Sequence, residues 1–124
     1  MKILLDTHVA LWWYIDSKLL SKASREALED INNTIFFSAA SSWELNLKIS
    51  IGKLKVPSEF FKQIMEDFIE LPVRSHHANR LLKIDMLHRD PFDLMLIAQC
   101  IEDDLVLVTR DKEILQYPIQ CLEA

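Results

Sequence analysis

The sequence predicts an α/β protein with one parallel sheet between helical layers, and three observations support this prediction. Short apolar runs alternate with longer segments of helical pattern along the chain. The runs are almost continuously apolar, which is typical of strands that are buried on both faces of a parallel sheet. The 124 residues, half of them hydrophobic, contain no repeat and only one glycine, Gly52. We therefore expect a single domain over residues 1–124, with four to five strands.

The expected strands are short segments rich in apolar, β-branched and aromatic residues. The first, "KILLD", ends in an acid, and the second, "TIFFS", ends in a serine. Both patterns indicate strands that end at a polar position. The five segments are residues 2–6, 34–38, 69–73, 105–109 and the less regular 119–122.

Helical patterns fill the intervals between these strands. In the helix that follows Asp90, almost every position is apolar, so we expect it to be deeply buried. Asp90 suits the N-cap, Pro91 the first helical position and Asp93 the first turn, where an acid faces the helix dipole. The expected helices cover about residues 21–31, 41–51, 58–69, 75–83 and 91–103.

Composition limits the cellular environment and the partners. The start "MKILLD" meets an acid at position 6, unlike a signal peptide, and the longest apolar run, residues 9–15, is too short to span a bilayer. We expect a cytoplasmic protein without a membrane partner. Cys100 and Cys121 fit no metal-binding spacing, and in a reducing compartment they are expected to be small core residues.

The charge distribution is acidic overall with one basic segment. A net charge of −5 argues against a protein that coats nucleic acid through bulk positive potential. Residues 47–63, however, carry four lysines and one glutamate. Such charges are either a solvated face or part of a basic rim around an acidic centre.

Three acids follow expected strands. Asp6 closes the first strand, Glu44 lies on the helix after the second, and Asp111 lies two residues past the fourth. Each has a purely structural explanation, because Asp6 and Asp111 suit N-caps and Ser41-x-x-Glu44 is a capping-box pattern. Capping does not explain their common location, since the carboxyl ends of parallel strands meet along one edge, where crevices hold ligands.

The buried helix that begins at Pro91 is expected to bring Asp93 toward the same crevice as Asp6. Two carboxylates about 4 Å apart near a surface repel by on the order of 4 kcal/mol, so a cation is needed among them. Oxygen ligands without cysteine favour Mg²⁺ or Mn²⁺. Such an ion can activate water and offset the charge of a phosphodiester, which is nuclease chemistry.

Four ordered stretches carry a family likeness over essentially the whole chain: "LLDTHVALWW", "SAASSWELNLKISIGKLKVP", "HRDPFDLMLIAQ" and "LVLVTRD". With them the sequence resembles the PIN-domain ribonucleases, in particular the VapC-like toxins of type II toxin–antitoxin pairs. The resemblance implies a PIN-like domain, Mg²⁺-dependent cleavage of RNA with Mn²⁺ as a substitute, a homodimer and a cognate antitoxin. It also implies four catalytic and metal-binding acids, which by motif position are Asp6, Glu44, Asp93 and Asp111.

The remaining polar candidates are supporting residues. Relatives often read DPFDR, whereas Leu94 follows Asp93 here, which puts a secondary contact in doubt but not the metal site. Lys48 lies four residues after Glu44, a spacing that suits a helix ion pair as well as a phosphate contact. Candidate substrate-binding residues are Lys48, Thr7 and Thr109, and the two threonines are alternatively turn residues or residues that orient the adjacent acids. We expect His8 and His88 to be structural.

Two other classes of protein fit parts of the pattern. A catalytically inactive PIN-like interaction module would keep the acids only as helix caps. A Mg²⁺-binding phospho-receiver domain has similar length and alternation, but the chain lacks a second acid beside Asp6 and a lysine after the last strand.

Overall fold

The computed structural model describes residues 1–124 and contains a single five-stranded sheet in which all neighbouring strands are parallel. This confirms the α/β class and the expected strand number. The strand order is β3-β2-β1-β4-β5. The strands are β1 (Lys2–Leu5), β2 (Thr34–Ser38), β3 (Ile69–Leu71), β4 (Val106–Thr109) and β5 (Cys121–Glu123).

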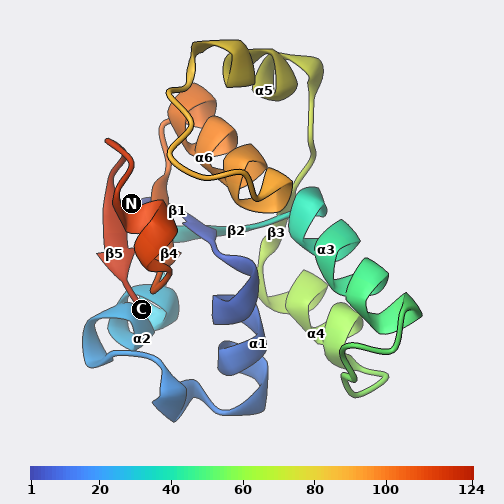
Figure 1. The fold of residues 1–124 in the computed structure, drawn as a ribbon. Helices are drawn as coiled ribbons and strands as arrows, with labels where there is room; N and C mark the ends of the chain where they lie inside the picture. The colour runs from blue at the N-terminus through green and yellow to red at the C-terminus, as the bar shows by residue number, and fades with distance from the viewer.

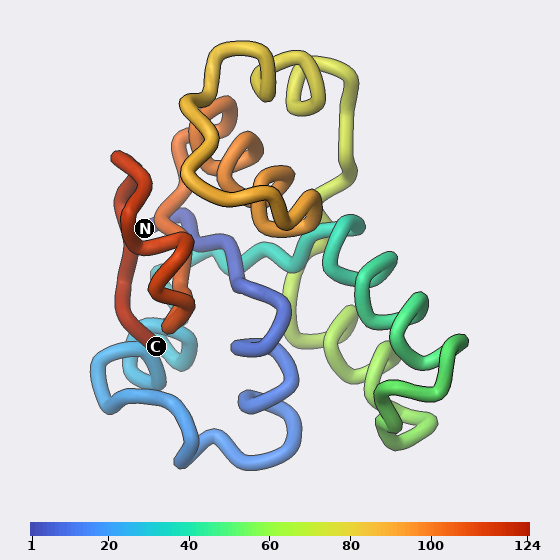
Figure 2. The backbone as a smooth tube through the Cα atoms, viewed as in Figure 1, coloured from blue at the N-terminus to red at the C-terminus, as the bar shows by residue number.

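The central strand β1 lies where the direction of the chain reverses across the sheet. From β1 the chain runs outward through β2 to β3, then returns over the sheet to form β4 and β5 on the other side of β1 (Figure 2). Leu4 of β1 is in register with Phe36 of β2 and with Leu107 of β4. The carboxyl ends of β1 and β4 therefore form a switch point, the place where open parallel sheets bind ligands.

Helices cover both faces of the sheet, with α5 and α6 on one side and α1 to α4 on the other (Figure 1). Helix α1 was not among the expected helices, whereas α6 has the predicted bounds. The helices are α1 (Thr7–Ile15), α2 (Lys22–Glu29), α3 (Ala39–Ser50), α4 (Phe60–Asp67), α5 (Ser75–Arg80), α6 (Pro91–Asp103) and α7 (Lys112–Leu115), with 3₁₀ turns η1 (Ser17–Leu19) and η2 (Leu81–Lys83).

The core is divided by the sheet because successive strand residues point to opposite faces. Ile3 and Leu5 pack into a cluster with α1, α2 and α4, whereas Leu4 packs into a second cluster with α6 and α7. Both faces of β1 are thus covered from Ile3 to Leu5, which explains the apolar sequence of these three residues.

Local features of α6 explain its predicted bounds. The Asp90 carboxylate accepts hydrogen bonds from the backbone N–H groups of Phe92 and Asp93, and Pro91 takes the first turn. The helix ends at Asp104, which adopts a left-handed conformation with φ of 54°. Cys100 and Cys121 are both free, as expected. No helix in the structure is long and apolar enough to cross a bilayer.

Candidate metal-binding site

Asp6 is fixed at the end of β1 by hydrogen bonds to both carboxylate oxygens. Its Oδ1 accepts from the backbone N–H of Thr7 at 2.7 Å, and its Oδ2 accepts from the hydroxyl of Thr109 at 2.8 Å. Its own N–H donates to the Val108 carbonyl, which extends the β1–β4 ladder to this residue. Asp6 is therefore the N-cap of α1, as the capping interpretation required, and is also held against the end of β4.

Thr109 joins Asp6 to the fourth predicted acid. The Thr109 hydroxyl donates to Asp6 and accepts from the backbone N–H of Asp111 at 3.1 Å. Asp111 caps α7 by accepting from the Glu113 N–H, and Asp6 and Asp111 line one surface pocket of about 220 Å³. The two threonines act inward, because Thr109 is fully buried and the Thr7 hydroxyl donates to Ser41. In this structure the Thr109 hydroxyl orients Asp6, and the Thr7 hydroxyl contacts Ser41.

Asp93 lies at the start of α6 and only 9% of its surface is exposed. Its pKa is raised to about 6, chiefly by burial and to a smaller extent by the carboxylates of Asp90, Asp6 and Asp111. A hydrogen bond from His88 opposes these effects. The charges of Asp6 and Asp111 therefore act on the Asp93 carboxyl.

The same interactions act on Asp6. Burial raises its pKa, and the Asp111 carboxylate adds to this effect, while the hydrogen bonds from Thr109 and Thr7 and the nearby His8 ring lower it. No lysine or arginine forms an ion pair with Asp6, Asp93 or Asp111. The three acids thus form a negative group without a lysine or arginine to neutralise it.

Glu44 lies on α3, but not in the predicted capping box. The helix begins at Ala39 with Ser38 as its N-cap, so Ser41 and Glu44 both lie inside the helix. The capping-box interpretation is wrong because the end of β2 supplies the cap directly. Ser41 accepts from Thr7 at 2.8 Å, and Glu44, one turn later on the same side of α3, is buried with 5% of its surface exposed.

Aromatic packing also brings α3 and α6 together. The ring of Trp43, next to Glu44 in sequence, packs edge to face on that of Phe92, next to Asp93, with centroids 4.9 Å apart. The Glu44 carboxylate pairs with Lys48 at 2.9 Å, the predicted helix ion pair. Glu44 is thus the only predicted acid that already has a lysine or arginine partner.

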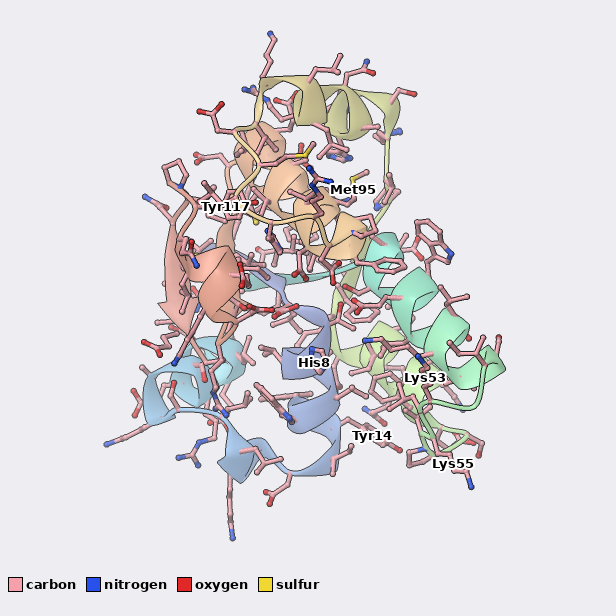
Figure 3. All side chains as sticks on the ribbon, in the orientation of Figure 1. His8, Tyr14, Lys53, Lys55, Met95 and Tyr117 are labelled. Atoms are coloured by element: carbon pink, nitrogen blue, oxygen red, sulfur yellow. The ribbon has the colours of Figure 1, made fainter.

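Arg110 is a nearby cation that the sequence did not single out. Its guanidinium lies over the Trp12 ring, 4.4 Å from the centroid. It donates to the carbonyl oxygens of Ala124 and Leu19, so its orientation is fixed. Arg110, Trp12 and His8 line the same pocket as Asp6 and Asp111. In contrast, Lys53 and Lys55 lie near the far end of α3, away from His8 (Figure 3).

His88 also contacts the site, which the sequence did not predict. Its Nε2 lies 3.0 Å from Asp93 Oδ2, and its Nδ1 lies 2.8 Å from the hydroxyl of Tyr117. The "HRDPFD" spacing offered a signal, because His88 is five residues before Asp93 and close to the helix start. Its tether, Tyr117, is distant in sequence and could not be recognised.

The tightest group of possible ligand atoms lies elsewhere, between α5 and the end of α6. The ligand atoms of His76, His77 and Asp103 lie within 4.8 Å of one another. His77 Nδ1 accepts the Arg74 N–H, so its proton is on Nε2, which donates to Asp103 at 2.8 Å. This proton occupies the lone-pair position that a metal would need. The cluster is therefore a helix cap joined to a hydrogen bond between His77 and Asp103.

The predicted acids have the donor chemistry of a hard cation. Asp6, Asp93, Asp111 and Glu44 supply only carboxylate oxygens, which suit Mg²⁺ or Mn²⁺ rather than a thiolate-preferring metal. Their burial and mutual repulsion disfavour the ionised forms of Asp6 and Asp93 in the metal-free protein. A divalent cation removes this repulsion, so the residues fit the ion that the sequence predicted.

Comparison with known proteins gives one family. Residues 3–119 match the family model of the PIN domain. Ribonuclease VapC22 of Mycobacterium tuberculosis is 26% identical over 121 residues, covering 90% of this chain and 88% of that protein.

Two solved structures have the same fold. One is VapBC2 from Rickettsia felis bound to a DNA fragment from its promoter, with a TM-score of 0.76 and 20% sequence identity. The match covers 99% of this chain and 98% of that chain. The other is DNA-bound VapBC from Salmonella typhimurium, with a TM-score of 0.74, 18% identity, and coverage of 98% and 97%.

Proposed function

The chain belongs to the PIN domain family, and on this premise we propose that it is a Mg²⁺- or Mn²⁺-dependent endoribonuclease, the toxin of a toxin–antitoxin pair. The observation that carries the proposal is the group of Asp6, Asp93 and Asp111, whose carboxylates act on one another at the switch point of the sheet without a lysine or arginine partner. The ribonuclease name of the relative from M. tuberculosis supports the substrate.

The four acids have different tasks in this proposal. Asp6 and Asp93 are buried and oriented by hydrogen bonds, so we assign them as the principal ligands. Asp111 is exposed beside Asp6. Glu44 supplies a ligand oxygen from α3 once its ion pair with Lys48 is broken. When bound, the ion lowers the pKa of a coordinated water and offsets charge on the phosphodiester.

Arg110 and Lys48 are the cations that we assign to the RNA backbone. Arg110 is already oriented by two carbonyl groups and the Trp12 ring, so little conformational entropy is lost when it contacts a phosphate. Lys48 becomes available when Glu44 binds the ion. Local cations of this kind allow a protein of net charge −5 to bind RNA at one place.

The partner proposals follow from the family and from the VapBC structures. We propose a cognate antitoxin that blocks the acidic site, and a homodimer in the cytoplasm. Trp12, Trp13 and Tyr14 of α1 are partly buried against the core of the α1 side.

RNA cleavage by the purified chain tests the proposal. We expect cleavage with Mn²⁺, none in EDTA, and none by Asp6→Asn. The matched control is Asp30→Asn, which removes an exposed acid beyond α2 and should cleave like the wild type. If the wild type fails to cut RNA with Mn²⁺, or if Asp6→Asn cuts as well as the wild type, the protein is better described as an inactive interaction module whose acids are only caps.

A further inference from the structure

The hydroxyl of Tyr117 has a defined hydrogen-bonding role. It accepts from the backbone N–H groups of Leu87 at 2.8 Å and His88 at 3.2 Å. Both acceptor positions of the oxygen are thus occupied, and the hydroxyl proton must point elsewhere. The remaining neighbour within hydrogen-bond distance is His88 Nδ1 at 2.8 Å. Tyr117 therefore donates to this nitrogen.

This donation fixes the tautomer of His88. Because Nδ1 accepts a hydrogen bond from the Tyr117 hydroxyl, the proton of the neutral imidazole is on Nε2. Nε2 lies 3.0 Å from Asp93 Oδ2, so it donates to that oxygen. The three side chains form a directed series in which Tyr117 orients His88 and His88 orients Asp93.

The series is positioned to hold one oxygen of Asp93 and leave the other free. The His88 side chain is 12% exposed and that of Asp93 13%, so water competes little for this hydrogen bond. Tyr117 is buried against α6, beside which it lies in Figure 3. The tether is therefore anchored in the core and not in the loop that carries His88.

We propose that His88, locked by Tyr117, is a positioning residue that holds Asp93 for divalent-cation binding. The inference rests on the proposed function, because it takes Asp93 as a ligand of the ion. A histidine that donates to a ligating carboxylate restricts the rotation of that carboxylate and directs its second oxygen toward the ion. His88 and Tyr117 therefore act on the proposed site through Asp93, without contacting the metal themselves.

Mn²⁺ titration of the full chain, followed by the electron paramagnetic resonance signal of free Mn²⁺, tests this role. His88→Leu removes the N–H donor, and we expect its Kd for Mn²⁺ to rise about tenfold or more, in the range known for outer-shell partners. His88→Gln should bind close to the wild type, because its amide N–H can replace Nε2. Tyr117→Phe, which frees the imidazole, should fall between them.

His76→Leu is the matched control. His76 on α5 also faces an aspartate, because its Nε2 lies 3.6 Å from Asp103 Oδ1, but Asp103 is at the opposite end of α6 from Asp93. It should bind Mn²⁺ like the wild type. Melting temperatures in EDTA show whether each variant is folded. If His88→Leu does not fold, the comparison of Tyr117→Phe and His88→Gln with the wild type still tests the role of His88.

The outcomes separate the inference from the proposed function. If the wild type binds Mn²⁺ and Asp93→Asn does not, but folded His88→Leu binds like the wild type, the positioning role is refuted and the metal site stands. Equal weakening in His88→Gln and His88→Leu also refutes it, because the donated N–H would then be irrelevant. If the wild type does not bind Mn²⁺, the proposed function fails and the inference fails with it.

Discussion

Replacement of Asp93 by asparagine should stabilise the metal-free protein. In the folded state its pKa is raised from an ordinary value of 3.8 to about 6, chiefly by burial and then by neighbouring carboxylates. The folded protein therefore holds this proton more tightly than the unfolded chain does. Between pH of about 4 and 6, the free energy of unfolding falls as the pH rises, and it stays low at neutral pH.

The size of the effect follows from the pKa difference. A pKa rise of about two units corresponds to a gain of about 3 kcal/mol in the free energy of unfolding at neutral pH. This value is an upper limit, because the amide nitrogen that the substitution introduces has no assigned acceptor. The asparagine side chain keeps an oxygen that accepts the His88 N–H. For a chain of this size the limit corresponds to a rise of the melting temperature on the order of 10 °C.

Thermal melts in EDTA at pH 7.5 and at pH 4 measure this prediction. Asp93→Asn should melt above the wild type at pH 7.5, and the difference should shrink toward pH 4, where the wild-type carboxyl is protonated in the folded state. Asp30→Asn, an exposed acid, controls for the change in net charge. A variant that is less stable than the wild type at pH 7.5, or a gap that widens in acid, would refute the reasoning.

Three further substitutions test neighbouring parts of the site. Thr109→Val removes the hydroxyl that donates to Asp6, so the free energy of unfolding in urea should fall by about 1 to 3 kcal/mol. An unchanged urea midpoint would contradict this prediction. Arg110→Gln should raise KM for RNA and flatten its salt dependence, with kcat nearly unchanged, in cleavage assays at two salt concentrations; an equal salt dependence argues against a phosphate contact. Lys48→Ala leaves the buried Glu44 carboxylate unpaired and should lower the free energy of unfolding in EDTA by on the order of 1 kcal/mol, more than an exposed helix pair contributes. An unfolding curve that matches the wild type would show that the ion pair does not contribute to stability.

The parts of the fold that the sequence predicted well have local causes. Helix α6 was predicted with its observed bounds because Asp90 and Pro91 define its start and the run to Asp103 is apolar. Helix α1 was missed for the opposite reason. Its sequence, "THVALWWYI", is apolar on nearly every side, so it shows no helical periodicity. Besides the Asp6 N-cap, its packing between the sheet and other helices explains it.

The site was predictable where strand order decides and not where distant segments meet. Asp6 and Asp111 follow strands that turn out to be neighbours, so a parallel sheet alone brings them to one edge. Glu44 was given a capping role because the sequence did not show that Ser38 both ends β2 and starts α3. The contact of His88 with Tyr117 joins segments 29 residues apart and depends on tertiary packing.

The central claim is that Asp6 belongs to a carboxylate group that binds a divalent cation in the folded state. Thermal melts of the wild type and Asp6→Asn, with and without Mn²⁺, test it most directly. At about 100 times its dissociation constant, a ligand adds about 2.7 kcal/mol of stability, so Mn²⁺ should raise the wild-type melting temperature and leave that of folded Asp6→Asn nearly unchanged. Equal responses of the two proteins to Mn²⁺ would contradict the claim.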